Sequence, residues 1–357
     1  MNYMHFESFS LLQEAEGEYA NYLKKQLRKY SKEADSILNY EDAKLLKEIT
    51  EAIIKAIRFS YNASYDKAIK TINNALGKLQ KSGVELFTTL GELESRMSSE
   101  NSYKMSANVF FKGRIMETCR EVKKKDLLHI PFNKRYKVRN QRYSVSGCPF
   151  IYLGKSSYID WLELGKPNFN TLYLSGFEVK AEVKLLNMCY TSTDCIQVVS
   201  HRREDLLAYP LIYASSFKVP YERKDEPFVP EYVIPQILMQ CALKNNASGV
   251  CYYSTKVTLN KQSKPLAMCL ALLARNNAHR KYCNQGLLFQ CITEPIAFQE
   301  VQLLPKDEVN RGILDPNCSQ FVTLANKMID YHRTNFFMVD QWIITNEMVK
   351  VKQGEDS

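Results

Sequence analysis

The chain has 357 residues, 45% of them hydrophobic, and a formal net charge of +9. This length fits one large domain or two smaller ones, and the apolar content is sufficient for a buried core. The longest apolar run, 265–274, is about half as long as a bilayer crossing requires, and no basic start followed by an apolar run marks a secretory signal. We therefore expect a globular, cytoplasmic protein without a membrane span.

The first hundred residues are predicted to be helical. Apolar residues recur every three or four positions at 45–57 and 68–79, which is typical of amphipathic helices. A third helix is predicted at 7–30, which is rich in Glu, Lys, Leu and Ala. The polar segment 98–102 then predicts a linker. We expect a helical domain over 1–100 that serves regulation or assembly.

Beyond residue 100 the pattern changes to short apolar runs. They are rich in β-branched or aromatic residues, which predicts strands at 109–111, 149–153, 171–174, 179–186, 250–253, 287–291 and 301–304. Helices are predicted at 204–216, 235–244 and 322–331, with Pro235 in a first turn. The expected fold class is α+β, in which the helical domain precedes a mixed α/β-sheet domain over 101–357 that folds independently.

The basic residues are concentrated in one segment. Residues 112–142 contain eleven Lys or Arg and three acidic residues, so this segment carries +8 and the rest of the chain is nearly neutral. Such a segment attracts anions, which can be a nucleic acid or a small ligand with phosphate groups. Tyr136 and Tyr143 lie between the basic residues of this segment, and their rings could stack on the nucleobases of a single-stranded nucleic acid.

The sequence lacks the signatures of common enzyme classes. It contains no GxGxxG or Walker loop, no HExxH motif and no GxSxG motif. The ten cysteines form no CxxC pair, and with the five histidines they give no spacing typical of zinc ligands. We expect buried, reduced thiols and no metal.

An ordered set of residues around the predicted strands carries the functional prediction. Lys112 and Arg114 end the first strand, Arg142 and Tyr143 precede the strand with Tyr152, and Glu163 follows eleven residues after Tyr152. Then come the motifs Tyr232-x-x-Pro235-Gln236 and Gly249-Val250-Cys251-Tyr252-Tyr253-Ser254-Thr255. In this order the motifs resemble the RES-domain family, named for its Arg, Glu and Ser, between residues 108 and 304.

The resemblance implies a fold like that of ADP-ribosyltransferase toxins and an enzyme that consumes NAD by hydrolysis or phosphorolysis. NAD is then the substrate, and no further cofactor is expected. The protein would be a toxin or defence effector, with an antitoxin, another regulatory protein or a second copy of itself as partner. The family pattern implies catalytic residues at Arg114, Glu163 and Ser254. It implies substrate-binding residues at Lys112, Arg142, Tyr143, Tyr152 and Gln236.

These residue types suit cleavage of the bond between nicotinamide and ribose. The reaction develops an oxocarbenium-like charge on the sugar, which a carboxylate such as Glu163 can stabilise. Arginine forks match a pyrophosphate, and an aromatic face of Tyr143 or Tyr152 can stack on the nicotinamide ring. Ser254 can hydrogen-bond the ribose or an incoming nucleophile. If Ser157 caps a helix, Glu163 lies on a partly buried face of that helix.

Other interpretations stay open at the level of sequence. The first is transfer of ADP-ribose to a macromolecule, which would use the same donor site. The second is a nucleic-acid-binding protein that uses the basic segment 112–142, but this leaves Tyr152, Glu163 and Ser254 unexplained. Each residue also has a purely structural interpretation, in which Glu163 is a solvent-facing helix residue and Arg142 is one more exposed base.

Overall fold

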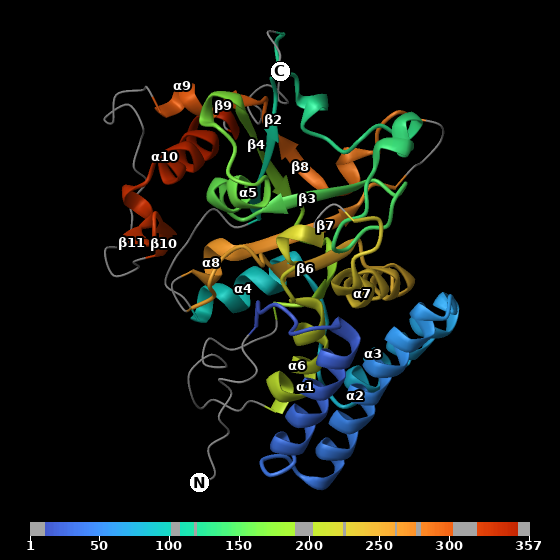
Figure 1. The fold of residues 1–357 in the computed structure, drawn as a ribbon. Helices are drawn as coiled ribbons and strands as arrows, with labels where there is room; N and C mark the ends of the chain where they lie inside the picture. Colours follow the sequence, from blue (N-terminus) through green and yellow to red (C-terminus); the bar gives the residue numbers. More distant parts are fainter. Residues whose placement is uncertain are drawn as a thin grey trace. The chain divides into compact units, whose positions relative to one another are not determined.

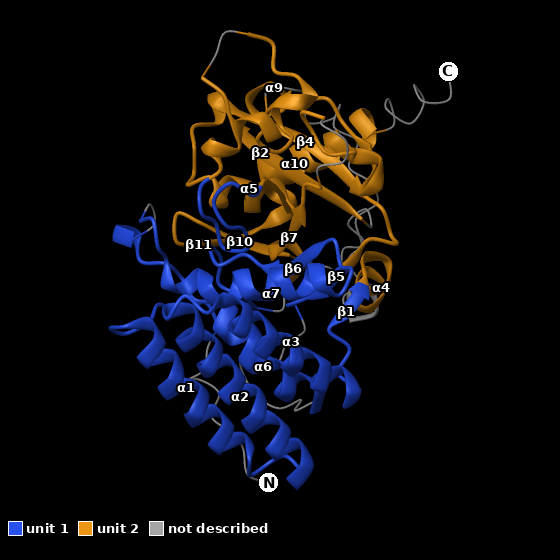
Figure 2. Ribbon diagram, turned by 90° about the vertical axis from the view of Figure 1, so that its right-hand side faces the viewer, with its two compact units in different colours: residues 1–88, 139–148, 185–261 blue, residues 89–138, 149–184, 262–357 orange. Residues whose placement is uncertain are grey.

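The structure is a computed structural model, and it describes residues 11–100, 108–117, 120–189, 203–223, 226–260, 263–275, 280–302 and 320–348. The chain divides into two compact units (Figure 2). Unit 1 comprises residues 1–88, 139–148 and 185–261, and unit 2 comprises residues 89–138, 149–184 and 262–357. Each unit is described by itself.

Unit 1 is built around five helices (Figure 1): α1 (Tyr19–Ala34), α2 (Tyr40–Tyr61), α3 (Tyr65–Lys81), α6 (Arg203–Ser215) and α7 (Val233–Lys244). Their apolar stripes explain the packing, since α1 and α3 contact α2, α2 contacts α6 and α7, and α3 contacts α7. The Tyr30 ring stacks on the Tyr209 ring with 4.9 Å between centroids. Arg203 pairs with Asp42 at 2.6 Å. The N-terminal helices thus share a core with residues that lie 161 or more positions further along the chain, as for Asp42 and Arg203.

The strands of unit 1 are β1 (Phe87–Thr89), β5 (Lys184–Asn187) and β6 (Gly249–Tyr253), in the order β1-β5-β6. β5 and β6 run parallel, with Leu185 opposite Gly249. All five residues of β6 are buried, which fits the uninterrupted apolar run that predicted this strand. Short 3₁₀ turns lie at Tyr221–Arg223 and Pro230–Tyr232 in the proline-containing segment before α7.

Unit 2 contains an antiparallel sheet with the strand order β7-β3-β2-β4-β8. Its strands are β2 (Val109–Ile115), β3 (Phe150–Gly154), β4 (Leu172–Val179), β7 (Met268–Leu273), β8 (Phe289–Ile292) and the short β9 (Ile296–Ala297), which pairs with β4. Its helices are α4 (Leu90–Glu100), α5 (Ser157–Glu163), α8 (Lys264–Ala267), α9 (Phe298–Gln302) and α10 (Asn335–Trp342). α10 contacts α5 and α9, and it continues into a π-helical turn at Ile343–Glu347.

Two glycines let α5 lie close to the sheet of unit 2. A Cβ atom at Gly113 in β2 would come within 2.9 Å of Leu164 Cδ1. A Cβ atom at Gly154 in β3 would come within 2.9 Å of Asp160 Oδ1. Ser156 caps the helix, because its side chain accepts a hydrogen bond from the backbone N–H of Ile159. The predicted cap at Ser157 is therefore off by one residue.

The α+β fold class is confirmed, and the helices predicted at 45–57, 68–79, 204–216 and 235–244 correspond to α2, α3, α6 and α7. Pro235 lies in the first turn of α7. The helix predicted at 7–30 begins only at Tyr19, and residues 7–10 lie outside the described residues. Ser98–Glu100, predicted as part of a linker, complete α4, and 101–102 lie outside the described residues.

Three predictions for unit 2 and its boundary with unit 1 were wrong. The predicted helix 322–331 is a hairpin of β10 (Phe321–Leu324) and β11 (Lys327–Asp330), because Ala325 and Asn326 both adopt positive φ and turn the chain back. Val301 lies in α9 rather than in a strand, and 303–304 are outside the described residues. The strand predicted at 179–186 is two strands, because β4 ends at Val179 and β5 begins at Lys184.

Seven of the ten cysteines lie in the described part of the chain, and all seven are free thiols. Six of them are buried and Cys148 is half-buried, in agreement with the prediction. Cys189, two residues after β5, and Cys251, in the middle of β6, approach within 3.3 Å between their sulfur atoms. The predictions for Cys119, Cys195 and Cys318 fall outside the described residues.

Candidate functional site

The eight residues predicted to form the site are divided equally between the two units. Unit 1 contains Arg142, Tyr143, Gln236 and Ser254. Unit 2 contains Lys112, Arg114, Tyr152 and Glu163.

Arg142 in unit 1 is half-buried and held by neutral groups. Its Nη1 donates to the carbonyl of Ser215 at 3.0 Å, and its Nη2 donates to Thr255 Oγ1 at 3.1 Å. The guanidinium lies 5.4 Å from the ring centre of Tyr232, in cation–π range. Within the described ranges no carboxylate forms an ion pair with Arg142. The side chain therefore presents an oriented, uncompensated positive charge, which suits an anionic ligand.

The position of Arg142 follows from a tight turn that Gln236 holds closed. Gln141 and Ser144 pair through both backbone hydrogen bonds, at 2.9 and 3.2 Å, so Arg142 and Tyr143 form the tip of the turn. Gln236 Nε2 contacts the Asn140 Oδ1 atom at 2.7 Å and the carbonyls of Gln141 and Ser144 at 3.0 and 3.3 Å. Gln236 was predicted to bind substrate, and these contacts show that its amide positions the Arg142 turn.

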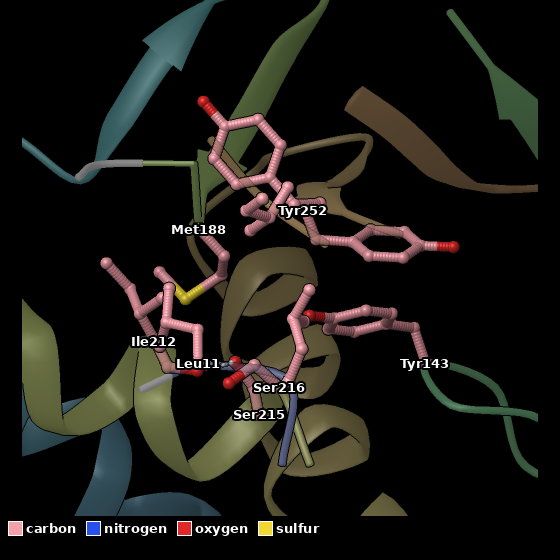
Figure 3. A pocket seen from close by; sticks show the side chains of 10 residues that line it. Leu11, Tyr143, Met188, Ile212, Ser215, Ser216 and Tyr252 are labelled. Atoms are coloured by element: carbon pink, nitrogen blue, oxygen red, sulfur yellow. Dashed lines mark hydrogen bonds between the residues drawn. The ribbon is translucent and has the colours of Figure 1, made fainter. Parts of the chain in front are cut away.

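Tyr143 is buried and lines a small hollow of unit 1 (Figure 3). Its ring lies against that of Tyr252, with 4.6 Å between the centroids. The hollow has a volume of about 10 Å³, enough for no more than one water. Its lining comprises Leu11, Leu12, Tyr143, Met188, Ile212, Ser215, Ser216, Tyr252, Tyr253 and Leu259.

Ser254 follows β6 and is fully buried. Its hydroxyl accepts a hydrogen bond from the backbone N–H of Lys256 at 3.2 Å, so it shapes the turn after the strand. The neighbouring Thr255 supplies the hydroxyl that contacts Arg142. Sequence reasoning missed Thr255 and Ser215. The only signal for Thr255 is its place in the motif that ends β6, and no local signal marks Ser215.

In unit 2, β2 pairs with β3 over a short stretch around Phe111 and Gly154, and the two strands separate beyond it. β2 is paired with β4 at every residue from Val109 to Ile115, whereas its register with β3 is Phe111 opposite Gly154. The half-buried Lys112 extends toward β3, and its Nζ donates to the carbonyl of Tyr152 at 3.4 Å. Burial lowers the pKa of Lys112 to about 8, with nearby Arg114 adding to this and Asp160 opposing it. The structure thus brings Lys112 to the strand that carries Tyr152.

Arg114, two positions after Lys112 in β2, is exposed and is anchored to a short turn. Its Nη1 donates to the carbonyl of Asp126 in a short turn at Lys124–Asp126. The Asp126 carboxylate accepts two hydrogen bonds of 2.9 Å from Arg120. These bonds are the main reason why the pKa of Asp126 falls to about 2. Arg114 therefore lies beside a carboxylate whose charge is already paired with Arg120.

The carboxylate that unit 2 buries on α5 is Asp160 and not Glu163. Glu163 is the last residue of α5 and is exposed, so its predicted place on a partly buried face is wrong. Asp160 is 8% exposed, and its Oδ2 has no hydrogen-bond partner among the described residues. Burial raises the pKa of Asp160 well above its usual range, while Lys112 opposes the shift. A buried carboxylate with a shifted pKa beside a lysine is a functional candidate that sequence reasoning missed.

The described residues contain neither a metal-binding cluster nor a membrane-spanning helix. No group of three His, Cys, Asp or Glu side chains comes together there in a way that could hold a metal ion. No helix in the described ranges combines the length and the apolar content that a bilayer crossing needs.

The comparisons with known proteins give one informative relative. The chain is 30% identical over 254 residues to the protein "Putative toxin YopC" of Bacillus subtilis (strain 168). The match covers 66% of this chain and 56% of that protein, so the chain spans little more than half the length of this relative. No family model and no solved structure matches the chain. The chain is thus similar to a protein named as a toxin, and its resemblance to the RES-domain family stays a prediction.

Proposed function

We propose that the protein is an enzyme that degrades NAD by cleaving the bond between nicotinamide and ribose, and that it acts in this way as a toxin or defence effector. The similarity to a protein named as a toxin supports the biological role. The order of the sequence motifs supports the chemistry. The proposed acceptor of the ADP-ribose group is water or phosphate.

The observation that carries the proposal is the environment of Arg142. A half-buried guanidinium normally needs an acidic partner, because desolvation of a charge is costly. Arg142 instead has Ser215, Thr255 and the Tyr232 ring as neighbours. An oriented guanidinium without a counter-charge matches the pyrophosphate of a dinucleotide, which is a dianion with two pairs of accepting oxygens.

Roles for the unit 2 residues follow from their placement. Lys112 and Arg114 lie on alternate positions of β2, where that strand leaves β3, and both can contact phosphate oxygens. The exposed Glu163 can approach a ribose from solvent and stabilise the positive charge that develops on it. Tyr152 is half-buried and can offer its ring to a base. In this proposal Ser254 shapes the backbone that presents Thr255 to Arg142.

The proposal can be tested in cells through NAD itself. Induced expression should stop growth, and the cellular NAD content should fall before growth stops. Arg142→Ala should weaken both effects, whereas Lys70→Ala, a change at an exposed position of α3, should keep both at full strength. Growth arrest with an unchanged NAD content would reject bulk degradation of NAD. It would favour ADP-ribose transfer to a scarce target, because such transfer consumes only one NAD for each modified site.

One observation favours a second candidate, the binding of single-stranded nucleic acid. Residues 133–137 of the basic segment are all exposed, and Tyr136 among them is 80% exposed. The exposed Lys281 extends this basic surface, since its carbonyl accepts a hydrogen bond from the Phe132 N–H at 2.9 Å. If this surface binds a single strand, affinity should fall steeply as salt increases. NAD turnover should respond to salt much less.

A further inference from the structure

The hollow of unit 1 and the Arg142 turn share residues. Ser215 lines the hollow, and its carbonyl accepts the hydrogen bond from Arg142 at 3.0 Å. Tyr143, which follows Arg142 at the tip of the turn, forms one wall of the hollow against Tyr252 (Figure 3). Any change in what fills the hollow therefore acts directly on the groups that hold the Arg142 guanidinium.

The start of the described chain forms one wall of the hollow. Leu11 and Leu12 belong to its lining, Leu12 is buried, and Figure 3 shows Leu11 beside Ile212 and Ser216. Gln13 fixes this segment at two points. Its side-chain amide donates to the Tyr213 hydroxyl, and its carbonyl accepts from the Lys218 N–H at 2.9 Å. Leu11 and Leu12 thus come from the N-terminal segment, whereas all other residues that line the hollow come from beyond residue 140.

The backbone indicates that this segment is held in place by side-chain burial. Leu12 has φ +67°, a left-handed conformation that leucine rarely adopts and that costs energy. Gly17, which has φ +79°, then provides an unstrained bend before α1 begins at Tyr19. A segment that combines local strain with a few apolar contacts has a small free-energy difference between its bound and released states.

We propose that Leu11–Gln13 is a built-in plug: it closes one side of the apolar hollow beside Arg142 and competes with the binding of substrate there. This proposal rests on the proposed function, since the substrate whose access the plug limits is NAD. While the plug is seated, only the released fraction of molecules binds NAD, so the apparent affinity is reduced by that fraction. Displacement of the plug would leave an apolar, tyrosine-walled recess that fits a flat aromatic ring of the dinucleotide.

The test uses full-length variants of the plug. Leu12→Gly keeps the backbone turn, because glycine adopts positive φ freely, and removes a side chain that lines the hollow. Leu11→Asp combined with Leu12→Asp disfavours burial altogether, and a variant that lacks residues 1–17 serves as a second means of removal. Glu14→Ala, at an exposed position of the same segment, is the matched control. Cooperative thermal unfolding of each variant establishes that it is folded.

Two readouts separate the plug from the proposed reaction. Fluorescence of the dye anilinonaphthalene sulfonate reports opening of the apolar hollow without any need for NAD turnover. Release of nicotinamide reports KM and kcat. If the plug is seated about nine-tenths of the time, its removal should lower KM for NAD about tenfold with kcat nearly unchanged. Dye fluorescence should rise in the same variants, and Glu14→Ala should change neither quantity.

The outcomes that contradict the plug differ from those that contradict the proposed function. Nicotinamide release with an unchanged KM in every folded plug variant would overturn the plug and leave the proposed function intact. Unchanged dye fluorescence in all plug variants would also overturn it, since the hollow would not have been opened. If no variant and no wild-type sample releases nicotinamide, the proposed function itself is wrong, and the regulatory proposal is rejected with it.

Discussion

The Arg142 guanidinium donates a hydrogen bond to the carbonyl of Ser215, the last residue of α6, at 3.0 Å. A cation at the C-terminal end of a helix is favoured by the helix dipole and satisfies a carbonyl that has no partner within the helix. The orientation of Arg142 therefore comes from the fold of unit 1 and is present before any ligand binds. Such preorganisation is what an anion-binding arginine requires.

Replacement of Arg142 should weaken substrate binding more than it slows the chemical step. We expect Arg142→Ala to raise KM for NAD roughly tenfold or more. Arg142→Lys should recover only part of the loss, because an ammonium cannot make two parallel hydrogen bonds to a phosphate. Steady-state kinetics of nicotinamide release give both constants. A tenfold loss of kcat at constant KM would contradict the binding role.

Lys112 should make NAD binding depend on pH. Burial lowers the pKa of Lys112 to about 8, so its ammonium is present below that pH and is lost as the pH rises through it. If Lys112 contacts a phosphate, KM for NAD should rise between about pH 7 and about pH 9. Lys112→Arg should abolish this rise, since a guanidinium stays charged throughout. The same rise in the Lys112→Arg variant would assign it to another group.

Glu163 should affect the chemical step rather than the binding of NAD. Glu163→Gln keeps the shape of the side chain and removes its charge, so kcat should fall about a hundredfold or more while NAD binding changes little. Because Glu163 is exposed, stability should not change. The control is Glu182→Gln, an exposed position of unit 2 outside the proposed site. Equal kcat values for the two variants would show that Glu163 is an ordinary surface residue.

Asp340 in unit 2 should make stability fall as the pH rises. Burial raises the pKa of Asp340 to about 7, against hydrogen bonds from Ser157 and Tyr331 that lower it. Its pKa in the unfolded chain is about 4. Between these values the folded protein binds more protons than the unfolded chain, so the free energy of unfolding decreases from about pH 4 to about pH 7. This one group can account for a few kcal/mol, as an order of magnitude.

Asp340→Asn isolates this contribution, because the amide keeps the shape and stays neutral. Its oxygen can still accept from the Ser157 N–H, which lies 3.1 Å from the Asp340 carboxylate. We expect the midpoint of thermal unfolding to fall less between about pH 5 and about pH 8 in the variant than in the wild type. Parallel pH profiles for the two proteins would show that Asp340 does not titrate in this window.

The packing of unit 1 argues against the prediction that residues 101–357 fold on their own. The Tyr30 hydroxyl donates to the carbonyl of Leu206 at 3.0 Å, and the Tyr19 hydroxyl donates to that of Ala214 at 2.9 Å, both inside unit 1. Removal of 1–100 would expose the apolar faces of α6 and α7 that these helices cover. We therefore expect the fragment 101–357 to aggregate in size-exclusion chromatography. A monomeric fragment with a cooperative unfolding transition would contradict this packing.

The sequence predicted local elements well and long-range contacts poorly. The apolar spacing at 45–57 and 68–79 identifies α2 and α3, because a helix buries neighbours three or four positions apart. β7 was not predicted, since an uninterrupted apolar run does not distinguish a buried strand from a helix. The hairpin at 321–330 depends on two residues with positive φ, which the apolar pattern does not reveal.

In the candidate site too, the long-range contacts could not be predicted from the sequence. Motif order identified Arg142, but its partners Ser215 and Thr255 are 73 and 113 positions away in sequence. Asp160 was passed over in favour of Glu163, because residue type does not tell which carboxylate of a short helix faces the core. The contacts of Gln236 with Asn140 and Gln141, which support the Arg142 turn, were not predicted, and its binding of substrate stays a prediction.

The most direct measurement is incubation of the purified full-length protein with NAD, in the presence and absence of phosphate, followed by identification of the products. The account predicts release of one nicotinamide for each NAD consumed. The other product should be ADP-ribose if water is the acceptor and a phosphorylated ADP-ribose if phosphate is. Quantitative recovery of intact NAD under both conditions, from protein that unfolds cooperatively, would contradict the central claim.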